Sequence, residues 1–175
     1  MDRVSTLNAP SESGYQIPDG AGIGHAHLKV SDLDRSLRFY CGILGFKLVT
    51  RFRDSAAFIA AGDYHHHLGL NTWESLGAEP PPRHSTGLYH VAIRYPTRRD
   101  LAVAVKRLQD AGVPLRGASD HGVSLAIYLS DPDGIGLELT WDRPADEWPR
   151  TTDGDLDLRM ADPFDLPGLL REAEG

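Results

Sequence analysis

The stretch that decides the fold is HGVSLAIYLSDPDGIGLELTWD, residues 121–142. Residues 123–129 are apolar and β-branched enough for a strand, and the DPDG sequence at 131–134 suits a turn with proline at its second position. After the turn, small and polar residues alternate with leucines and a tryptophan. The stretch therefore predicts a β-hairpin that places Glu138 on the face opposite the leucines.

Glu138 needs a partner in such a hairpin. A carboxylate flanked by leucines in a strand is costly to bury alone, because burial disfavours its charged form. An ionised group in that position is usually compensated by a basic side chain or by a metal ion. The hairpin thus predicts an arginine, a lysine or a metal close to Glu138.

Composition excludes several classes of function. The chain has 175 residues, 41% of them hydrophobic, and a formal net charge of −7, which predicts one globular domain and argues against a nucleic-acid partner. No run approaches the roughly 20 apolar residues of a membrane span, and the first residues lack the apolar core of a secretion signal. We therefore expect a cytoplasmic protein. Cys41 is the single cysteine and is expected to pack rather than react.

The same order of elements occurs twice along the chain. From Gly24, HAHLKV reads as a strand, residues 31–45 as a capped helix, and three strand-like runs follow before residue 76. After a linker with three consecutive prolines, LYHVAIRY reads as a strand, residues 97–112 as an amphipathic helix, and three more strands follow. Placing His25 over His90 aligns the two copies, so the sequence predicts an internal repeat of βαβββ units.

The predicted fold class is α+β, with the paired units forming curved mixed sheets. We expect a flexible arm at residues 1–21, one domain at 22–143 made of units 22–76 and 87–143, and a C-terminal extension at 144–175 with one short helix.

Two histidines occupy the same place in the two copies. His25 opens the first strand of one unit, His90 opens the equivalent strand of the other, and Glu138 lies in the closing strand. Two imidazoles and one carboxylate form the facial triad that holds Fe(II) and leaves positions open for substrate and oxygen. We therefore predict His25, His90 and Glu138 as metal ligands. His27 shares a strand face with His25 and is the alternative ligand if the register differs.

These motifs carry a family resemblance over about residues 22–143. The sequence resembles the vicinal oxygen chelate superfamily and, within it, the type I extradiol dioxygenases. Their signature is present as His121, five residues, Ile127-Tyr128, then DPDG at 131–134 and Glu138 after three further residues. Only Ser119, two residues before the histidine, departs from the usual pattern.

The resemblance implies the same three metal ligands, and it adds two further groups. It implies that His121 and Tyr128 hydrogen-bond the substrate and the reaction intermediate, which suits an imidazole and a phenol that both donate and accept.

The run His65-His66-His67 ends the first unit, where the family carries an acid–base histidine. Strand alternation favours His67 slightly, because it shares a face with Gly69, whereas the family spacing favours His66. Gly69 stands at the position equivalent to Glu138, where glyoxalases have a fourth ligand, so the resemblance implies three ligands and an open site.

The function predicted from the sequence is an Fe(II)-dependent dioxygenase that cleaves a catechol-like ring with O2, acting on a small aromatic substrate as a homodimer. Mn, Ni or Zn is an alternative metal. The first competing function is a glyoxalase-type isomerase or lyase using Ni or Zn. The second is a non-catalytic protein that binds a small molecule such as a drug. Classical extradiol enzymes have four βαβββ units, whereas this chain has two, so another segment or a second subunit is expected to close the pocket.

Overall fold

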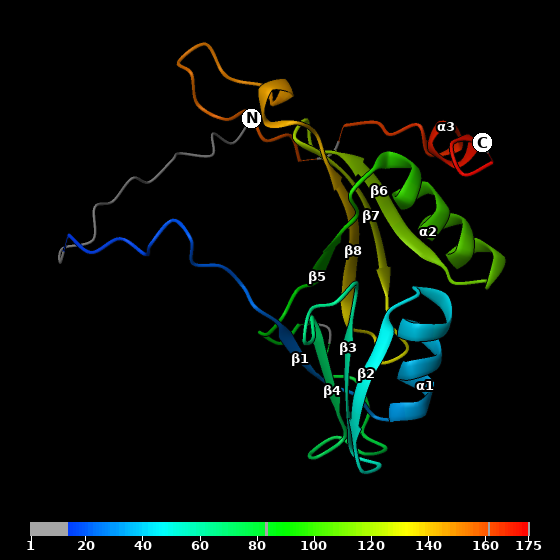
Figure 1. Ribbon diagram of the computed structural model, residues 1–175. Coiled ribbons are helices and arrows are strands. Elements are labelled where there is room, and N and C mark those ends of the chain that lie inside the picture. The colour runs from blue at the N-terminus through cyan, green and yellow to red at the C-terminus, as the bar shows by residue number, and fades with distance from the viewer. Residues whose placement is uncertain (1–13, 83, 161, 175) are drawn as a thin grey trace.

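Two four-stranded sheets, one from each βαβββ unit, form the body of the protein (Figure 1). The computed structural model describes residues 14–82, 84–160 and 162–174. The first sheet has the strand order β1-β4-β3-β2 and the second has the order β5-β8-β7-β6. In each sheet the first and last strands of the unit pair in parallel and the other pairs are antiparallel. The predicted α+β fold of repeated βαβββ units is confirmed.

The helices and strands lie close to their expected places. The first unit contains β1 (Ala26–Lys29), α1 (Leu33–Leu37), the π-helix η1 (Arg38–Ile43), β2 (Lys47–Phe52), β3 (Ala56–Ala60) and β4 (Leu68–Asn71). The second contains β5 (Val91–Arg94), α2 (Arg98–Asp110), β6 (Leu115–Asp120), β7 (Ser124–Ser130) and β8 (Gly136–Asp142). The extension adds the 3-10 helix η2 (Ala145–Glu147) and α3 (Leu166–Arg171).

Local sequence explains where the two main helices begin and end. Asp32 caps α1 by accepting a hydrogen bond from the backbone nitrogen of Arg35, and Thr97 caps α2 in the same way. Gly45 and Gly112 follow the helical segments with φ angles of +86° and +70°, a conformation that glycine adopts without steric cost.

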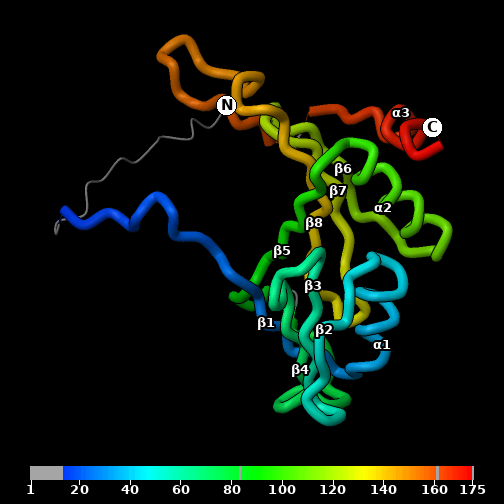
Figure 2. The backbone as a smooth tube through the Cα atoms, in the orientation of Figure 1, coloured from blue at the N-terminus to red at the C-terminus, as the bar shows by residue number. Residues whose placement is uncertain are grey.

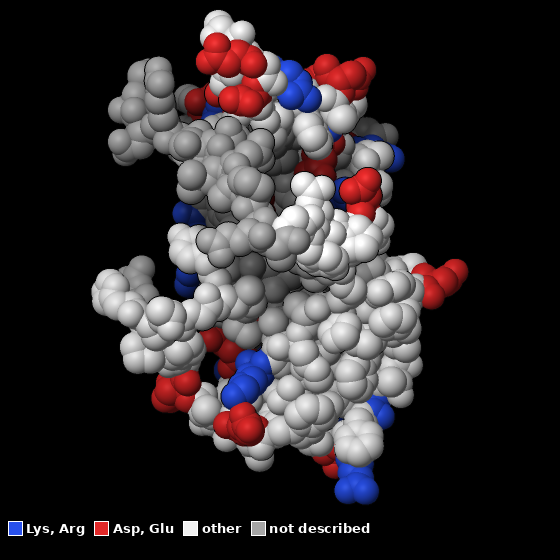
Figure 3. All heavy atoms as spheres, turned by 90° about the vertical axis from the view of Figure 1, so that its left-hand side faces the viewer, with Lys and Arg blue, Asp and Glu red and all other residues white. Residues whose placement is uncertain are grey.

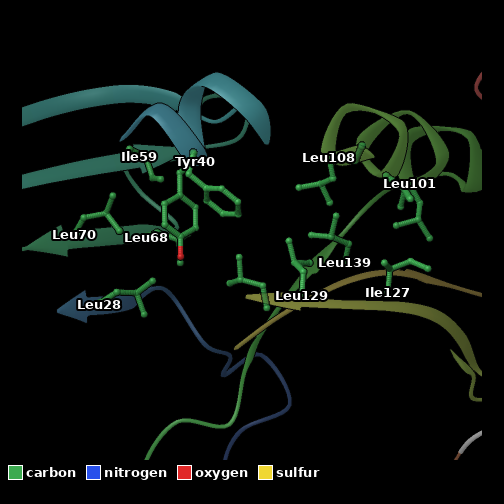
Figure 4. Close-up of a cluster of buried hydrophobic side chains, with 14 of the residues drawn as sticks. Leu28, Tyr40, Ile59, Leu68, Leu70, Leu101, Leu108, Ile127, Leu129 and Leu139 are labelled. Carbon is green, nitrogen blue, oxygen red and sulfur yellow. The ribbon is translucent and has the colours of Figure 1, made fainter. Parts of the chain in front are cut away.

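Each helix covers one face of its own sheet, and the apolar residues between them form the core. The α2 stripe of Leu101, Val105 and Leu108 is fully buried, as are the hairpin residues Ile127 and Leu139. Figure 4 shows apolar side chains of the two units, which belong to one core cluster, with Tyr40 beside Leu68 in the first unit. The leucines of the hairpin therefore face α2, which leaves Glu138 on the other face, as predicted.

The two aspartates of the DPDG turn in the second unit are buried against the first unit and join the two units. Tyr40 is fully buried, and its hydroxyl donates to Oδ2 of Asp131 at 3.0 Å. Asp133 accepts from Ser31 Oγ at 2.6 Å and pairs with Arg35. Both aspartates are nearly inaccessible to solvent, so these hydrogen bonds provide polar partners for charges that burial would otherwise destabilise.

The faces of the two sheets that carry no helix open on the side of the molecule away from α1 and α2 (Figure 1). Residues 14–25 precede β1 without forming a helix or strand and extend away from the body (Figure 2). The rest of the expected N-terminal arm, residues 1–13, lies outside the described residues. The C-terminal extension packs on the body, because Leu169 of α3 is fully buried and Arg98 of α2 pairs with Glu172 at 2.9 Å. None of the helices within the described ranges is long and apolar enough to cross a membrane.

Candidate active site

His90 and Glu138 meet on the open face of the second sheet. Ala92 of β5 pairs with Glu138 of β8, and the alternation along the strand places His90 on the same face as Ala92. His90 Nε2 lies 2.9 Å from Glu138 Oε2, and the glutamate side chain is only 12% exposed. Within the described ranges, Glu138 pairs with His90 and with no lysine or arginine.

The short contact requires a proton or a metal ion between the two atoms. A carboxylate oxygen and the lone pair of a neutral imidazole are both acceptors, so they approach to 2.9 Å only if a proton or a metal ion lies between them. Two adjacent ligands, each about 2.1 Å from a divalent ion and at right angles, would lie about 3 Å apart. The spacing of His90 and Glu138 therefore fits two of the three ligands of a facial triad.

Tyr128 and His121 lie next to this pair. Tyr128 of β7 is the direct cross-strand neighbour of Glu138, and its ring centre is 5.9 Å from that of His90. Its hydroxyl is 2.7 Å from Nε2 of His121, whose Nδ1 is 2.6 Å from the backbone oxygen of Arg159. Burial, followed by the charge of Glu138, raises the pKa of Tyr128. Tyr128 thus keeps its proton at neutral pH and can donate it in a hydrogen bond.

A second cluster of histidines lies on the open face of the first sheet. The ring of His66 is 4.4 Å from that of His25 and 5.0 Å from that of Phe58. Partial loss of solvent, and then the neighbouring His25, lowers the pKa of His66. His67 instead accepts a hydrogen bond from the backbone nitrogen of Ala61 on its Nδ1 and lies against Tyr64. His66 therefore lies beside His25, whereas strand alternation slightly favoured His67. His65 turns its Nδ1 toward Nδ1 of His66 at 2.8 Å.

His27 occupies the space where a glyoxalase-type fourth ligand would begin. It pairs with Gly69 across β1 and β4, the same register that Ala92 and Glu138 have in the other unit. A Cβ atom added to Gly69 would lie 2.9 Å from the His27 ring, which is also flanked by Phe58 and Trp73. The glycine and the histidine ring are therefore complementary in shape.

The three predicted ligands are not gathered at one point. The part of the chain that the structure describes contains no group of three His, Cys, Asp or Glu side chains positioned to hold an ion. The physical reason is that His25 precedes β1 of the first sheet, whereas His90 precedes β5 and Glu138 lies in β8 of the second sheet. The donor types fit a divalent metal, and two of the three are already at the spacing of adjacent ligands.

A cavity of about 500 Å³ lies between the two units. His27 of β1, the linker prolines 80 and 81, Tyr89 and Gly136 contribute to its wall. The cavity lining includes Tyr89, the chain neighbour of His90, and Gly136, two residues before Glu138, but neither His90 nor Glu138 itself. A larger, polar cavity of about 760 Å³ is lined by Arg35, Asp133 and their neighbours, and none of the predicted site residues reaches it.

The side of the molecule on which the two sheets open is shown in Figure 3. Charged side chains gather toward the upper and lower ends of this view, and the broad area below its middle is mostly uncharged.

Sequence reasoning did not find the contact between His121 and Arg159. It uses the backbone oxygen of Arg159, which every residue type provides, so no motif could have indicated it.

Comparison with known proteins supports the motif analysis. The sequence model of the Glyoxalase/Bleomycin resistance protein/Dioxygenase superfamily matches residues 22–139. A catechol-2,3-dioxygenase of Bacillus subtilis is 40% identical over 158 residues, which are 90% of this chain and 54% of that protein. A probable lactoylglutathione lyase of Synechocystis is 29% identical over 124 residues, which are 66% of this chain and 91% of that protein. The chain therefore spans about half the length of the dioxygenase.

Solved structures agree on the fold. A glyoxalase/dioxygenase from Nostoc punctiforme superposes with a TM-score of 0.62 at 22% identity, covering 74% of this chain and 98% of that one.

Proposed function

The chain belongs to the Glyoxalase/Bleomycin resistance protein/Dioxygenase superfamily, and we propose that within it the protein is an extradiol-type dioxygenase that cleaves a catechol-like ring with O2. The observation that carries the proposal is the 2.9 Å contact of His90 with Glu138 beside the hydrogen-bonded pair of Tyr128 and His121. The 40% identity with a catechol-2,3-dioxygenase supports it.

His90 and Glu138 would hold the metal ion, which we propose to be Fe(II), and His25 would be the third ligand. Bringing His25 to the other two is part of the proposal, and it would involve the β1 edge of the first sheet or a second copy of the chain in a homodimer. Such an ion, when bound, supplies a centre at which both oxygens of a catechol and O2 can bind together.

The other residues would bind the substrate and move protons. The Tyr128 hydroxyl, beside the metal-binding pair, would form a hydrogen bond with a substrate oxygen. His66 has a lowered pKa and is largely neutral near pH 7, so it could accept a proton from the second substrate hydroxyl. Phe58, in contact with the His66 ring, would provide an apolar wall near the substrate.

A glyoxalase-type isomerase or lyase is the second candidate. It is favoured by length, since the chain covers 91% of a probable lactoylglutathione lyase but 54% of the catechol dioxygenase. Gly69 argues against it, because the position of a fourth ligand lacks a side chain and the His27 ring fills the space.

Metal analysis of anaerobically purified protein, followed by oxygen uptake with a panel of catechols, tests the proposal. Bound iron, oxygen consumption and a yellow ring-cleavage product would support the dioxygenase. Zinc or nickel with turnover of a thiol adduct would instead support the isomerase. If neither result is obtained, the alternative of a non-catalytic binding protein is supported.

A matched pair of variants tests the ligand set. Glu138→Ala should lose the metal and keep the fold, whereas Glu74→Ala removes an exposed carboxylate paired with Lys29 and should keep both. Full metal occupancy in Glu138→Ala would show that the ligands are wrongly assigned.

A further inference from the structure

His121 is held from two sides, and the two contacts differ in kind. Its Nδ1 is 2.6 Å from the backbone oxygen of Arg159, and its Nε2 is 2.7 Å from the hydroxyl of Tyr128. A carbonyl oxygen only accepts hydrogen bonds, so Nδ1 must carry a proton. In the neutral imidazole, Nε2 then has a lone pair, and the Tyr128 hydroxyl must donate to it.

The direction of this hydrogen bond has a chemical consequence. A tyrosine that donates its proton to histidine keeps its oxygen lone pairs for another donor, such as a substrate hydroxyl. With the opposite tautomer, Nε2–H would donate to Tyr128, whose proton would then point toward the site. The tautomer of His121 therefore determines whether Tyr128 accepts a hydrogen bond from the substrate or donates one to it.

Arg159 is held in place by several contacts in the segment after β8. Its backbone nitrogen donates to the oxygen of His121 at 3.1 Å, so the two residues exchange two hydrogen bonds. Its guanidinium pairs with Asp162 at 3.0 Å and with Asp157 at 3.6 Å. The backbone nitrogen of Asp120, next to His121, donates to the backbone oxygen of Asp162 at 3.4 Å in an isolated β-bridge.

The start of the segment that follows β8 is held by the residues on either side of His121. Arg143 makes a two-pronged ion pair with Asp120, at 2.9 and 2.8 Å, and also donates to the oxygen of Gly122. Asp120 in turn accepts from the backbone nitrogen of Gly122 at 2.8 Å. Residues 143–160, which we call the C-terminal strap, are thus tied to both sides of His121 and lie beyond the family match that ends at residue 139.

We propose that Arg159 is a positioning residue whose backbone oxygen, presented by the C-terminal strap, holds His121 as the Nδ1–H tautomer and so makes Tyr128 the donor in their hydrogen bond. The importance of this arrangement for turnover rests on the proposed function, which assigns His121 and Tyr128 to the site. The tautomer itself depends only on the geometry of the strap.

The tautomer can be measured without metal or substrate. In long-range proton–nitrogen correlation spectra of the full-length apoprotein with 15N-labelled histidine, above about pH 8, His121 should show a protonated Nδ1 and an unprotonated Nε2. The His121→Gln variant assigns the signals. Tyr128→Phe should leave the Nδ1–H form dominant, because the Arg159 oxygen remains in place.

Displacing the strap should change the result. Arg159→Pro removes the backbone donor to His121 and the ion pairs with Asp157 and Asp162, so the residue 159 oxygen is no longer held against Nδ1 and the Nδ1–H form should cease to be dominant. A folded Arg159→Pro variant that keeps this form dominant would overturn the inference. Arg150→Ala, a change in the same segment whose side chain contacts Gly154 rather than His121, should behave as the wild type. If Arg159→Pro does not fold, Tyr128→Phe decides the matter alone.

Two other outcomes would also overturn the inference: an Nε2–H tautomer in the wild type, or its appearance in Tyr128→Phe, which would show that Tyr128 sets the tautomer. Failure of the proposed function is distinguishable, because absence of catechol cleavage with the Nδ1–H form present would leave the inference standing.

Discussion

The buried hydrogen bond between Tyr40 and Asp131 makes a prediction about how the two units are held together. Tyr40→Phe removes the hydroxyl that donates to Asp131 at 3.0 Å and leaves the rest of a fully buried ring in place. A hydrogen bond to a charged group contributes about 1.5–3 kcal/mol. In a domain of this size, a loss of 1 kcal/mol lowers the melting temperature by about 2–4 °C. We therefore expect a decrease of about 3–12 °C at pH 7.

The effect should depend on pH in a defined direction. Burial raises the pKa of Asp131, so the folded state binds its proton more tightly than the unfolded state does. The contribution of this group to stability is complete below its unfolded pKa of about 3.9 and is lost as the pH rises through the folded pKa. The Tyr40 hydroxyl opposes that loss by stabilising the carboxylate. Its removal should cost more at pH 7 than at pH 3.5, where a neutral hydrogen bond contributes only about 0.5–1.5 kcal/mol.

Thermal and urea unfolding, followed by circular dichroism at both pH values, measure the effect. Tyr89→Phe is the matched control, because that side chain is 89% exposed and its change should leave the melting temperature within about 1 °C. A Tyr40→Phe variant as stable as the wild type at pH 7, or a loss of equal size at both pH values, would refute the reasoning.

Three further predictions concern the site and the strap. In urea titrations, Gly69→Ala should lower the free energy of unfolding by about 1 kcal/mol, because the added methyl group contacts the His27 ring. Adding His27→Ala should restore the lost stability, and a double variant that recovers none of it would contradict this explanation. The hydrogen bond from Arg143 lowers the pKa of Asp120, so the contribution of this pair to the free energy of unfolding is present above about pH 4 and is lost as the pH falls. The difference in free energy of unfolding between wild type and Arg143→Ala should therefore be smaller at pH 3 than at pH 7. A difference that does not change with pH would argue against this coupling. His66→Ala should lower kcat by about 10²–10⁴-fold in catechol assays, with His67→Ala closer to wild type, and equal losses would remove the distinction.

Short-range sequence patterns were sufficient for most of the fold. The alternation around Glu138, the helical stripe of Leu101 and Val105, and the turn residues at 131–134 each act within a few positions, so their structural outcome could be predicted. The repeat of His25 and His90 likewise located the two units. These features depend on the backbone period and on burial, which the order of residues specifies directly.

Long-range packing decided the rest. The sequence could not tell that His66 would lie beside His25, because the run precedes β4 and its side-chain contacts depend on how that segment packs against β1 and β3. It could not show that Arg159 would present an oxygen to His121 from 38 positions away, since a backbone atom carries no residue signature. By itself, the sequence determined the two units and the kinds of side chain at their strand starts. The tertiary structure decided which of those side chains meet, because their distances depend on how the two sheets pack together.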